Sequence, residues 1–560
     1  MSDPVPPSSS KASGSGSYVP RYIHVLIIVA LSLIVYASTL GYPFVWDDFN
    51  FIKNNPHVHE PNSFAAFLTR PELLSNASEY NDKIYRPLRS WVFAKLYKTV
   101  GADPFFYHML SVALHASTCM MLFLWLARWT GDDSLAGLTS ALFAVHPIHT
   151  EAVSWISSMA DPLSTLLLFT MLWLLAFPKP FWALVLGLLF PLALLAKEMS
   201  ITAPFLAWLC MKRNHRNAPR GFYLGFSAAL GMALAFIFLR AYILGRFAQA
   251  PFTLDQLEHC FVRSPYLLWL YAKMIVFPWP QTAYISYVVP MGWQKWLGFL
   301  FAFLLAFGAW KWRVWWWRRE PWHTAVLASV CFMVSLSPII GIVPVVVDMA
   351  ERFVYMPSAF LLTAIVAVLK AVLPQRISIV WIKKVSAGLA ILVLGSMTML
   401  RNEVWSDDLR LATENAAVQP PHPGAQWNLA VSAVKARQFG TAVNAYRRYL
   451  ALAPGNEQVF SQLAAAHIEL RQWHDAQWAA EEAIRLDNKS FSGWLNLGVS
   501  LKGKGEYHQA LHAIDRAIQL RPQSHHGYLR RARVYQEMGE LEKADRDLAT
   551  VTIIKHSVTP

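Results

Sequence analysis

Two adjacent carboxylates stand close behind the first hydrophobic stretch of the chain. They end the sequence Gly-Tyr-Pro-Phe-Val-Trp-Asp-Asp at residues 41–48, which follows an apolar stretch from about residue 22 to 40. Charged side chains are costly in or near hydrocarbon, so Asp47 and Asp48 need a physical reason. One interpretation is an acid pair beside the membrane that is solvated by water or caps the next helix. The other is a catalytic acid held at the membrane surface.

Four later groups of polar residues suit an anionic or reacting partner. They are Tyr85-Arg86-Pro87-Leu88 with Arg89, His146-Pro147-Ile148-His149-Thr150-Glu151, Lys197-Glu198, and Glu351-Arg352 with Tyr355. A guanidinium donates in a planar fork that matches phosphate or carboxylate oxygens. Each group also has a structural interpretation: a packed histidine, a polar turn, or a satisfied Lys–Glu pair. Two histidines and a glutamate could ligate a metal, but no further carboxylate cluster completes a shell, so we expect none.

The composition divides the chain into a membrane part and a soluble part. Of 560 residues, 55% are hydrophobic and 15% charged, against about 25% charged in soluble domains. The apolar bulk precedes residue 400, and 24 tryptophans suit interfacial belts. The net charge of +14 comes from Lys and Arg in loops between apolar stretches, which indicates cytoplasmic loops rather than a nucleic-acid site. Four cysteines form no disulfide or zinc framework.

Eleven apolar stretches are expected to cross the membrane. The first is a retained helix because it has no small-residue cleavage site, and residues 1–20 before it form a cytoplasmic terminus whose Ser/Pro/Gly-rich part, 1–18, should be disordered. The stretches are 22–40, 106–127, 134–147, 160–177, 181–196, 200–211, 222–244, 293–311, 324–347, 357–374 and 384–400. The predicted membrane domain therefore occupies residues 21–402, and its outer loop 41–107 carries the acid pair.

The distribution of basic residues predicts the orientation. Three basic clusters, near residues 212–220, 311–319 and 370–384, fall on one side if the stretch 265–280 does not cross. Pro265 and Lys273 make that stretch a poor span and a plausible interfacial or re-entrant helix. The positive-inside rule then puts the N-terminus in the cytoplasm and the C-terminus outside. Asp47, Asp48 and the four polar groups would all face outward.

The polar C-terminal part repeats every 34 residues. Small residues recur with this period, and so do turn residues and large residues at the start of a helix. The positions are 454, 488 and 522; 442, 476, 510 and 544; 430, 464, 498 and 532; and 439, 473, 507 and 541. This period predicts about four tetratricopeptide (TPR) repeats over 423–557, after a linker or first helix at 403–422. Such arrays offer a concave groove to proteins, although a scaffold for oligomerisation is also compatible.

In order along the chain, these motifs resemble the transmembrane and tetratricopeptide-repeat-containing protein O-mannosyltransferases. The motifs are Trp46-Asp47-Asp48, Tyr85-Arg86-Pro87-Leu88, His146-Pro147-Ile148-His149-Thr150-Glu151, Lys197-Glu198 with Ile201-Thr202, and residues 351–358. The resemblance implies an all-α fold: a multi-span membrane domain of the GT-C class followed by a TPR α-solenoid. It also implies a polyprenyl-phosphate sugar donor and a catalytic Asp in the first outer loop.

We expect Asp47 to act as the base that deprotonates an acceptor hydroxyl, with Asp48 orienting it, or the reverse. Arg86, Lys197 and Arg352 are the candidates for binding the donor phosphate. The residues expected to line the site are His146, His149, Glu151, Glu198 and Glu351. No cofactor is expected beyond the lipid-linked sugar.

The expected function is transfer of a sugar, mannose by resemblance, to protein hydroxyls on the outer face. The expected partners are the bilayer, the donor and a protein acceptor in the TPR groove, without nucleic acid. The location would be a bacterial inner membrane with periplasmic repeats, or an endoplasmic-reticulum membrane with lumenal repeats. Two alternatives stay open: a GT-C enzyme that glycosylates a lipid or glycan, and a non-catalytic TPR adaptor for envelope proteins.

Overall fold

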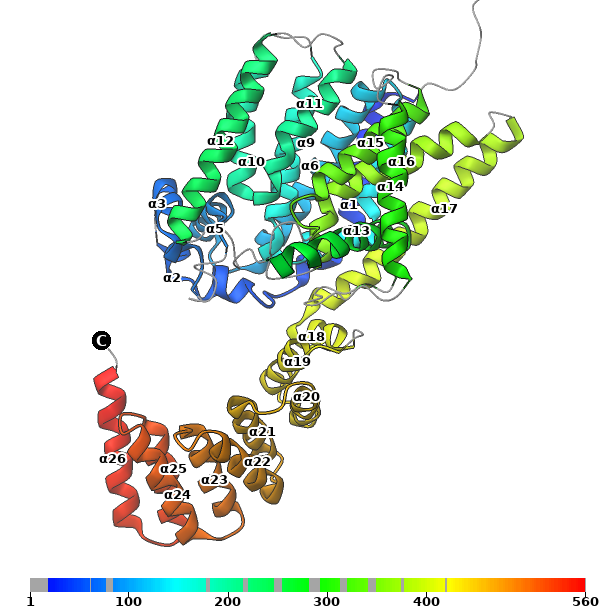
Figure 1. Cartoon of the computed structure of the whole chain (residues 1–560). Helices are drawn as coiled ribbons and strands as arrows, with labels where there is room; N and C mark the ends of the chain where they lie inside the picture. Colours follow the sequence, from blue (N-terminus) through cyan, green and yellow to red (C-terminus); the bar gives the residue numbers. More distant parts are fainter. Residues whose placement is uncertain are drawn as a thin grey trace, which may run out of the picture.

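The computed structural model describes most of the chain, and every regular element in it is helical. The described residues are 19–60, 62–76, 84–177, 182–214, 220–245, 254–279, 281, 293–312, 320–340, 349–373, 377–417 and 421–558. The predicted disorder of residues 1–18 and parts of the three basic clusters lie outside these ranges. Figure 1 shows a bundle of helices with a curved helical arm extending from its lower end. The predicted all-α fold is confirmed.

The bundle contains a helix for each of the eleven apolar stretches. They are α1 (Arg21–Tyr36), α6 (Pro104–Thr130), α7 (Asp133–Val145), α9 (Ala160–Leu175), α10 (Trp182–Ala196), α11 (Ala203–Asn214), α12 (Arg220–Leu244), α14 (Gln294–Trp312), α15 (Pro321–Leu336), α16 (Tyr355–Val372) and α17 (Ile377–Asn402). Among the described residues, six helical segments are long and apolar enough to span a membrane, and five shorter apolar helices accompany them. The chain is therefore a membrane protein; the number of crossings stays a prediction.

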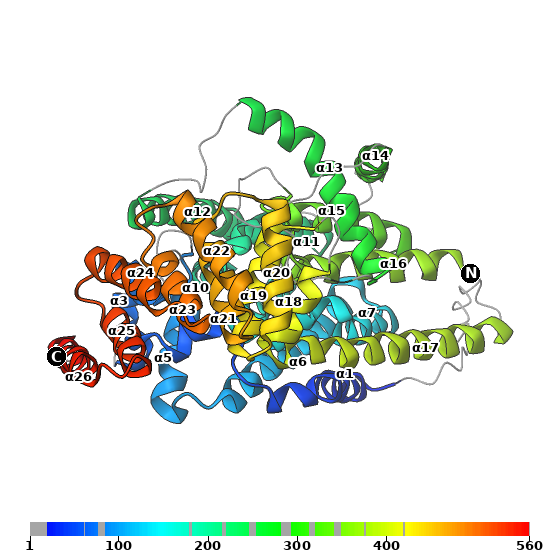
Figure 2. The same ribbon diagram turned by 90° about the horizontal axis from the view of Figure 1, so that it is seen from below.

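Helix α13 (Leu254–Val276), which contains Pro265, differs from its neighbours in direction. It is absent from the candidate spans of the described chain. In Figure 1 it lies across the lower end of the bundle, and Figure 2 shows it lengthwise while α14 is seen end-on. This is the geometry expected of an interfacial helix, and it supports the non-crossing interpretation of 265–280 without testing the topology itself.

The turns between bundle helices follow from local sequence. Helix α6 ends at Gly131, whose φ of 74° lies in the left-handed region that glycine adopts without a steric penalty. The next residue, Asp132, caps α7 by accepting a hydrogen bond from the amide of Leu135 at 3.1 Å. A Gly–Asp pair therefore reverses the chain within two residues and sets α6 and α7 side by side.

The outer loop forms short helices at the lower end of the bundle. They are α2 (Pro56–His59), α3 (Phe64–Thr69) and α5 (Pro87–Val100), with helical turns η2 (Phe49–Lys53) and η3 (Pro71–Leu74). Proline at the first position of α5 is favoured because its missing N–H has no partner there anyway. Figure 1 shows α2, α3 and α5 at the end of the bundle from which the helical arm extends.

The arm consists of helical hairpins packed in sequence order. Its helices are α18 (Asp408–Ala416), α19 (Pro423–Lys435), α20 (Phe439–Leu452), α21 (Glu457–Glu469), α22 (Trp473–Leu486), α23 (Phe491–Gly503), α24 (Tyr507–Leu520), α25 (His525–Glu537) and α26 (Leu541–Val558). The small residues that recur every 34 positions are buried where paired helices touch, for example Ala442, Ala476 and Ala510 at 0% exposure. The turns inside the hairpins keep the same period, with positive φ at Arg437, Arg471, Gly505 and Gly539.

Candidate active site

The two acids of the outer loop differ in their surroundings. Asp48 is fully buried, and each of its oxygens accepts hydrogen bonds from the protein. Its Oδ1 accepts from the amide of Ser157 at 2.8 Å and from the Ser157 hydroxyl, while its Oδ2 accepts from the amide of Val45 at 3.1 Å. Asp47 keeps 9% exposure. The geometry therefore makes Asp48 the anchored acid and leaves Asp47 nearer to solvent.

Burial dominates the electrostatics of Asp48. Loss of water raises the pKa of its carboxyl from 3.8 to about 7, although the bonds from Ser157 and Val45 act in the opposite direction. The adjacent charge of Asp47 raises it further. Asp48 can therefore carry a proton near neutral pH, and the pair need not hold two negative charges at once.

Arg89 on α5 lies near this pair. Its side chain is 1% exposed, and Nη1 donates to the carbonyl oxygen of Ser157 at 3.2 Å. The guanidinium carbon lies 4.1 Å from the ring centroid of Phe51. Its Nε and Nη2 find no hydrogen-bond partner in the described part of the chain. Burial, followed by the nearby Arg86, lowers the pKa of Arg89 to about 9, while Asp47 and Asp48 act in the opposite direction. An additional anion here would be favourable.

Two of the three cations expected to bind phosphate are paired with carboxylates. Arg86 forms a fork with Glu198, with Nε–Oε2 at 3.0 Å and Nη2–Oε1 at 2.6 Å. Lys197 does not pair with its neighbour Glu198 but forms a buried ion pair with Asp161. Burial lowers the pKa of Lys197 to about 8 even though Asp161 raises it. In the structure described, neither cation is available without a carboxylate beside it.

The third cation, Arg352, is paired as well. Its guanidinium binds the fully buried Glu151, whose Oε2 also accepts from the backbone amide of Arg352 at 2.8 Å. Burial raises the pKa of Glu151, and the charge of Arg352 opposes this shift. Glu351, the neighbouring acid, instead lies 3.5 Å from Arg401 at the end of α17. These two pairs join the loops before α9 and α16 to the last membrane helix.

The two histidines expected to line the site have structural hydrogen bonds at both ring nitrogens. Nε2 of His146 lies 2.8 Å from the carbonyl oxygen of Ile275 in α13, and Nδ1 accepts from the amide two residues later at 3.2 Å. Nδ1 and Nε2 of His149 each lie 2.8 Å from a partner, the carbonyl of Phe143 and the hydroxyl of Ser358. Among the described residues, no group of His, Cys, Asp and Glu side chains is arranged to hold a metal ion.

The structure brings residues from all five sequence motifs into one electrostatic network. The charges of Asp47, Asp48, Arg86 and Glu198 act on the pKa of Arg89. The charges of Asp161, Arg86 and Glu198 act on the pKa of Lys197. The Glu151–Arg352 pair belongs to the same network, because the charge of Asp161 also acts on the pKa of Glu151. His146, His149 and Glu351 bind Ile275 in α13, Ser358 in α16 and Arg401 in α17, respectively.

Sequence reasoning missed the role of two residues in this network. Ser157 follows the His-Pro-Ile-His-Thr-Glu motif closely, but a serine carries no signal that would single it out. Arg89 lies in the first turn of α5, whereas Arg86 is the residue just before that helix. Its place in the first turn of a helix that begins at Pro87 is the signal that could have directed attention to Arg89.

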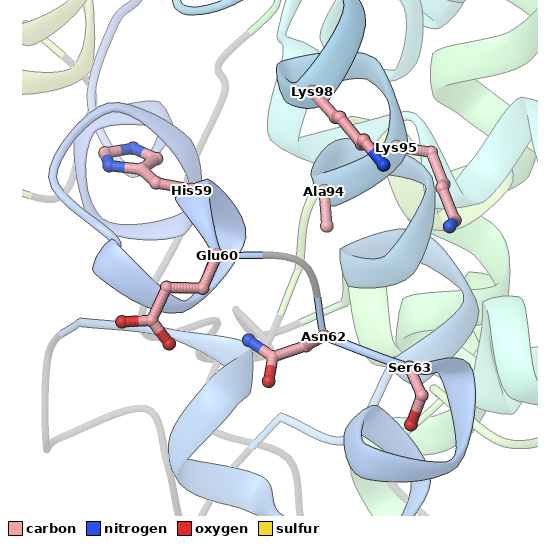
Figure 3. A pocket seen from close by; sticks show the side chains of 7 residues that line it. All are labelled: His59, Glu60, Asn62, Ser63, Ala94, Lys95 and Lys98. Atoms are coloured by element: carbon pink, nitrogen blue, oxygen red, sulfur yellow. The ribbon is translucent and has the colours of Figure 1, made fainter.

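A groove in the outer loop lies apart from the acid pair. It has a volume of about 530 Å³ and is lined by His59, Glu60, Asn62, Ser63, Ala94, Lys95 and Lys98. Figure 3 shows Lys95 and Lys98 of α5 on one side and His59 with Glu60 on the other. Lys95 is six residues from Arg89 along α5, which corresponds to roughly 9 Å. The groove is a second feature of the outer loop, with charged and polar residues among its lining.

The family models match one repeat of the arm. Residues 491–524 match the model described as tetratricopeptide repeat. Solved structures similar to the chain include MamA 41-end from Desulfovibrio magneticus RS-1, at 16% identity and a TM-score of 0.25, covering 27% of this chain and 86% of that one. The Arabidopsis OM64 TPR domain has 24% identity and a TM-score of 0.20, covering 20% of this chain and 94% of its own.

Curated relatives match the membrane part as well. A Caenorhabditis elegans protein named Protein O-mannosyl-transferase F38B6.6 is 27% identical over 72% of this chain and 59% of its own length. The Drosophila melanogaster Protein O-mannosyl-transferase Tmtc1 is 30% identical over 50% of this chain and 32% of its length. The mouse Protein O-mannosyl-transferase TMTC1 is 35% identical over 25% of this chain and 15% of its own length. The chain thus spans less than two thirds of the length of each of these relatives.

The fold and the site define the class first: a helical membrane protein with a TPR array and a buried acid–base network at the end of the bundle that carries the array. The relatives then make the resemblance specific. The resemblance to the transmembrane and tetratricopeptide-repeat-containing protein O-mannosyltransferases is confirmed.

Proposed function

We propose that the protein is a membrane glycosyltransferase that transfers a sugar from a polyprenyl-phosphate donor to protein hydroxyl groups on the outer face. One observation carries the proposal: a buried pair of acids lies beside a buried guanidinium with two unbonded nitrogens. Acid and cation in one enclosed place are what a reaction needs when it removes a proton and releases a phosphate. Relatives named O-mannosyl-transferases support mannose as the sugar.

In the proposed reaction, Asp47 accepts the proton of the acceptor hydroxyl. The hydroxyl oxygen forms a bond to the anomeric carbon, and the bond from that carbon to the phosphate oxygen breaks. The electron pair leaves with the polyprenyl phosphate. Asp48 cannot easily take Asp47's place, because Ser157 and Val45 already occupy its oxygens. Asp48 instead fixes the loop and orients Asp47.

The leaving phosphate is proposed to bind on the cationic side of the network. Arg89 is the strongest candidate because two of its nitrogens have no partner in the described chain. Arg86, Lys197 and Arg352 remain candidates only if the phosphate competes with Glu198, Asp161 and Glu151 for them. Glu198 is the most exposed of these three carboxylates, with 43% of its side chain accessible. Arg86 is therefore the paired cation most easily shared with a ligand.

The TPR array is proposed to gather the protein acceptor. It extends from the end of the bundle that carries the outer loop (Figure 1), so a polypeptide held by the repeats would reach the acid pair without crossing the membrane. On this proposal the acids and the array both lie outside the cytoplasm, in a periplasm or lumen. The interfacial direction of α13 supports the eleven-crossing topology that this location requires.

The test is donor turnover by the purified full chain in liposomes. Polyprenyl-phosphate mannose and other polyprenyl-phosphate sugars are supplied with hydroxyl-rich peptides, and release of polyprenyl phosphate is measured. Wild type should release it, and Asp47→Asn should be slower by roughly 10²–10⁴-fold, the scale of a general base. Equal release by both proteins would refute the catalytic role. Transfer to lipid alone would favour the lipid-acceptor alternative, and no release from any donor would favour the adaptor.

A further inference from the structure

Trp46, the residue before the acid pair, has an unusual backbone. Its φ is 53°, in the left-handed region, where a bulky side chain collides with its own backbone. Such a conformation costs roughly 1–3 kcal/mol and persists only where the surroundings enforce it. The peptide that follows Trp46 begins Asp47. Whatever holds Trp46 therefore also sets the direction of Asp47.

The contacts that hold Trp46 come from distant parts of the chain. Its amide donates to Oδ1 of Asp408 at 2.7 Å. Its indole stacks on Trp155 with a centroid distance of 5.1 Å and an angle of 22°. Trp155 in turn stacks on Trp405 at 5.7 Å and 16°, and Trp405 is fully buried. Asp408 and Trp405 both belong to the segment that follows the last membrane helix.

This segment has two faces. Leu411 of α18 packs with Val45 and Trp405 in the cluster around Trp46. On its other side, Ala412 and Ala416 pack into the hydrophobic core of the first repeat. Helix α18 thus touches the acid-pair loop and the TPR array at the same time.

The first repeat also reaches the loop directly. Lys435, at the end of α19, lies 3.7 Å from Oδ2 of Asp408. Its ammonium is 5.7 Å from the ring centroid of Phe49, which follows the acid pair. One carboxylate therefore binds Trp46 through one oxygen and approaches the array through the other.

We infer that Asp408, together with the Trp46–Trp155–Trp405 stack, is a positioning device for the acid pair that ties the catalytic loop to the base of the repeat array. This inference rests on the proposed function and deepens it. Asp408 contacts no reacting group. It acts through Trp46, because loss of its oxygen lets Trp46 relax to negative φ and turns the peptide that carries Asp47. Asp408 thereby connects the loop that carries the acids with the first repeat of the array.

Two substitutions at one position separate positioning from charge. Asp408→Ala removes the acceptor oxygen, whereas Asp408→Asn keeps an oxygen for the Trp46 amide and removes the charge that faces Lys435. Glu403→Ala is the matched control, since it removes an exposed carboxylate of the same segment that pairs with Arg410. All are made in the full chain. Unchanged far-ultraviolet circular dichroism and elution volume establish that each variant is folded.

The first readout is donor turnover. Misplacing a reacting group by about 1 Å costs about 10²-fold, so kcat of Asp408→Ala should fall between about 10- and 100-fold with the donor KM changed less than about twofold. Asp408→Asn and Glu403→Ala should stay within about twofold of wild type. An Asp408→Ala variant with wild-type kcat, or with a change in KM alone, overturns the inference.

The second readout does not need activity. Stacked indoles couple in near-ultraviolet circular dichroism, so the coupled signal should weaken in Asp408→Ala and persist in Asp408→Asn. If wild type turns over no donor, the proposed function fails. The dichroism would still test whether Asp408 holds Trp46 in the tryptophan stack. Identical near-ultraviolet dichroism in wild type and the three variants would overturn the inference that Asp408 positions Trp46.

Discussion

Asp48 and Ser157 are joined by two hydrogen bonds to a single oxygen atom. The amide of Ser157 donates to Oδ1 at 2.8 Å, and its hydroxyl donates to the same atom. The carbonyl oxygen of Ser157 accepts from Arg89 at 3.2 Å. One serine before α9 therefore holds the anchored acid on one side and the buried guanidinium on the other.

The raised pKa of Asp48 predicts a pH-dependent stability. Burial raises the pKa of this carboxyl from its ordinary value of 3.8 to about 7. The folded state thus binds this proton more tightly than the unfolded state does. Its contribution to stability is present below about pH 4 and is lost as the pH rises to about 7. Melting temperatures of wild type in detergent should fall relative to Asp48→Asn across that interval. Parallel curves for the two proteins would contradict the raised pKa.

The cations of the site should separate into ligands and structural partners. Arg89→Gln is expected to raise the donor KM at least about tenfold, the scale of a lost charged hydrogen bond of roughly 1.5–3 kcal/mol. Arg86→Gln should have a smaller effect, because Glu198 already binds two nitrogens of its guanidinium. Lys197→Gln should chiefly lower stability, since Asp161 is left buried without a partner. Donor titrations and melting curves on the same preparations distinguish the outcomes. A larger KM effect at Lys197 than at Arg89 would show that the ligand assignment is wrong.

The Glu151–Arg352 pair should be critical for stability. Glu151 is completely buried, so Glu151→Gln leaves the guanidinium without its counter-ion and should lower the free energy of unfolding by about 3–5 kcal/mol. Adding Arg352→Met should recover part of the loss. The exposed pair Arg485–Glu482 on α22 is the control, and Glu482→Gln should leave the unfolding midpoint unchanged. Equal effects of the two glutamate substitutions would indicate that burial of the first pair has no energetic consequence.

The small residues of the repeats predict a difference between two glycines. A Cβ at Gly498 would collide with Ile514 and lie 3.0 Å from the carbonyl oxygen of Ala510. Gly498→Ala should therefore destabilise the array by about 1–3 kcal/mol. A Cβ at Gly440 would meet nothing within 4 Å, so Gly440→Ala should be neutral or stabilising by up to about 1 kcal/mol. Denaturant unfolding of both variants measures the difference. The reverse order would argue against close helix contact at position 498.

The topology can be tested with reporters. If α13 lies in the interface and does not cross, a reporter fused after Lys311 should be cytoplasmic and one fused after Pro420 should be outside. Lys311 lies in the last turn of α14, and Pro420 comes after α18 in the sequence. Reporters on the same side of the membrane would overturn the eleven-crossing prediction and the outward location of the acid pair.

The local features of this protein were readable from its sequence because they depend on spacing. Apolar runs of membrane length predict helices whatever surrounds them, and a 34-residue period requires a repeated hairpin. The small residues at 442, 476 and 510 are buried as expected, since two helices approach closely only where side chains are small. The sequence also singled out Asp47 and Asp48, because adjacent acids beside a span are physically unusual.

Only the tertiary structure decided which charged side chains form ion pairs with one another. Lys197 and Glu198 are neighbours in sequence, yet they pair with Asp161 and Arg86. Trp46, whose φ is 53°, donates its amide hydrogen to Asp408, 362 positions away. Such pairings depend on how helices are arranged in three dimensions, and partners far apart in sequence leave no periodic signal. A buried charge must find a counter-ion or a hydrogen bond, but sequence alone does not determine which partner the fold brings within reach.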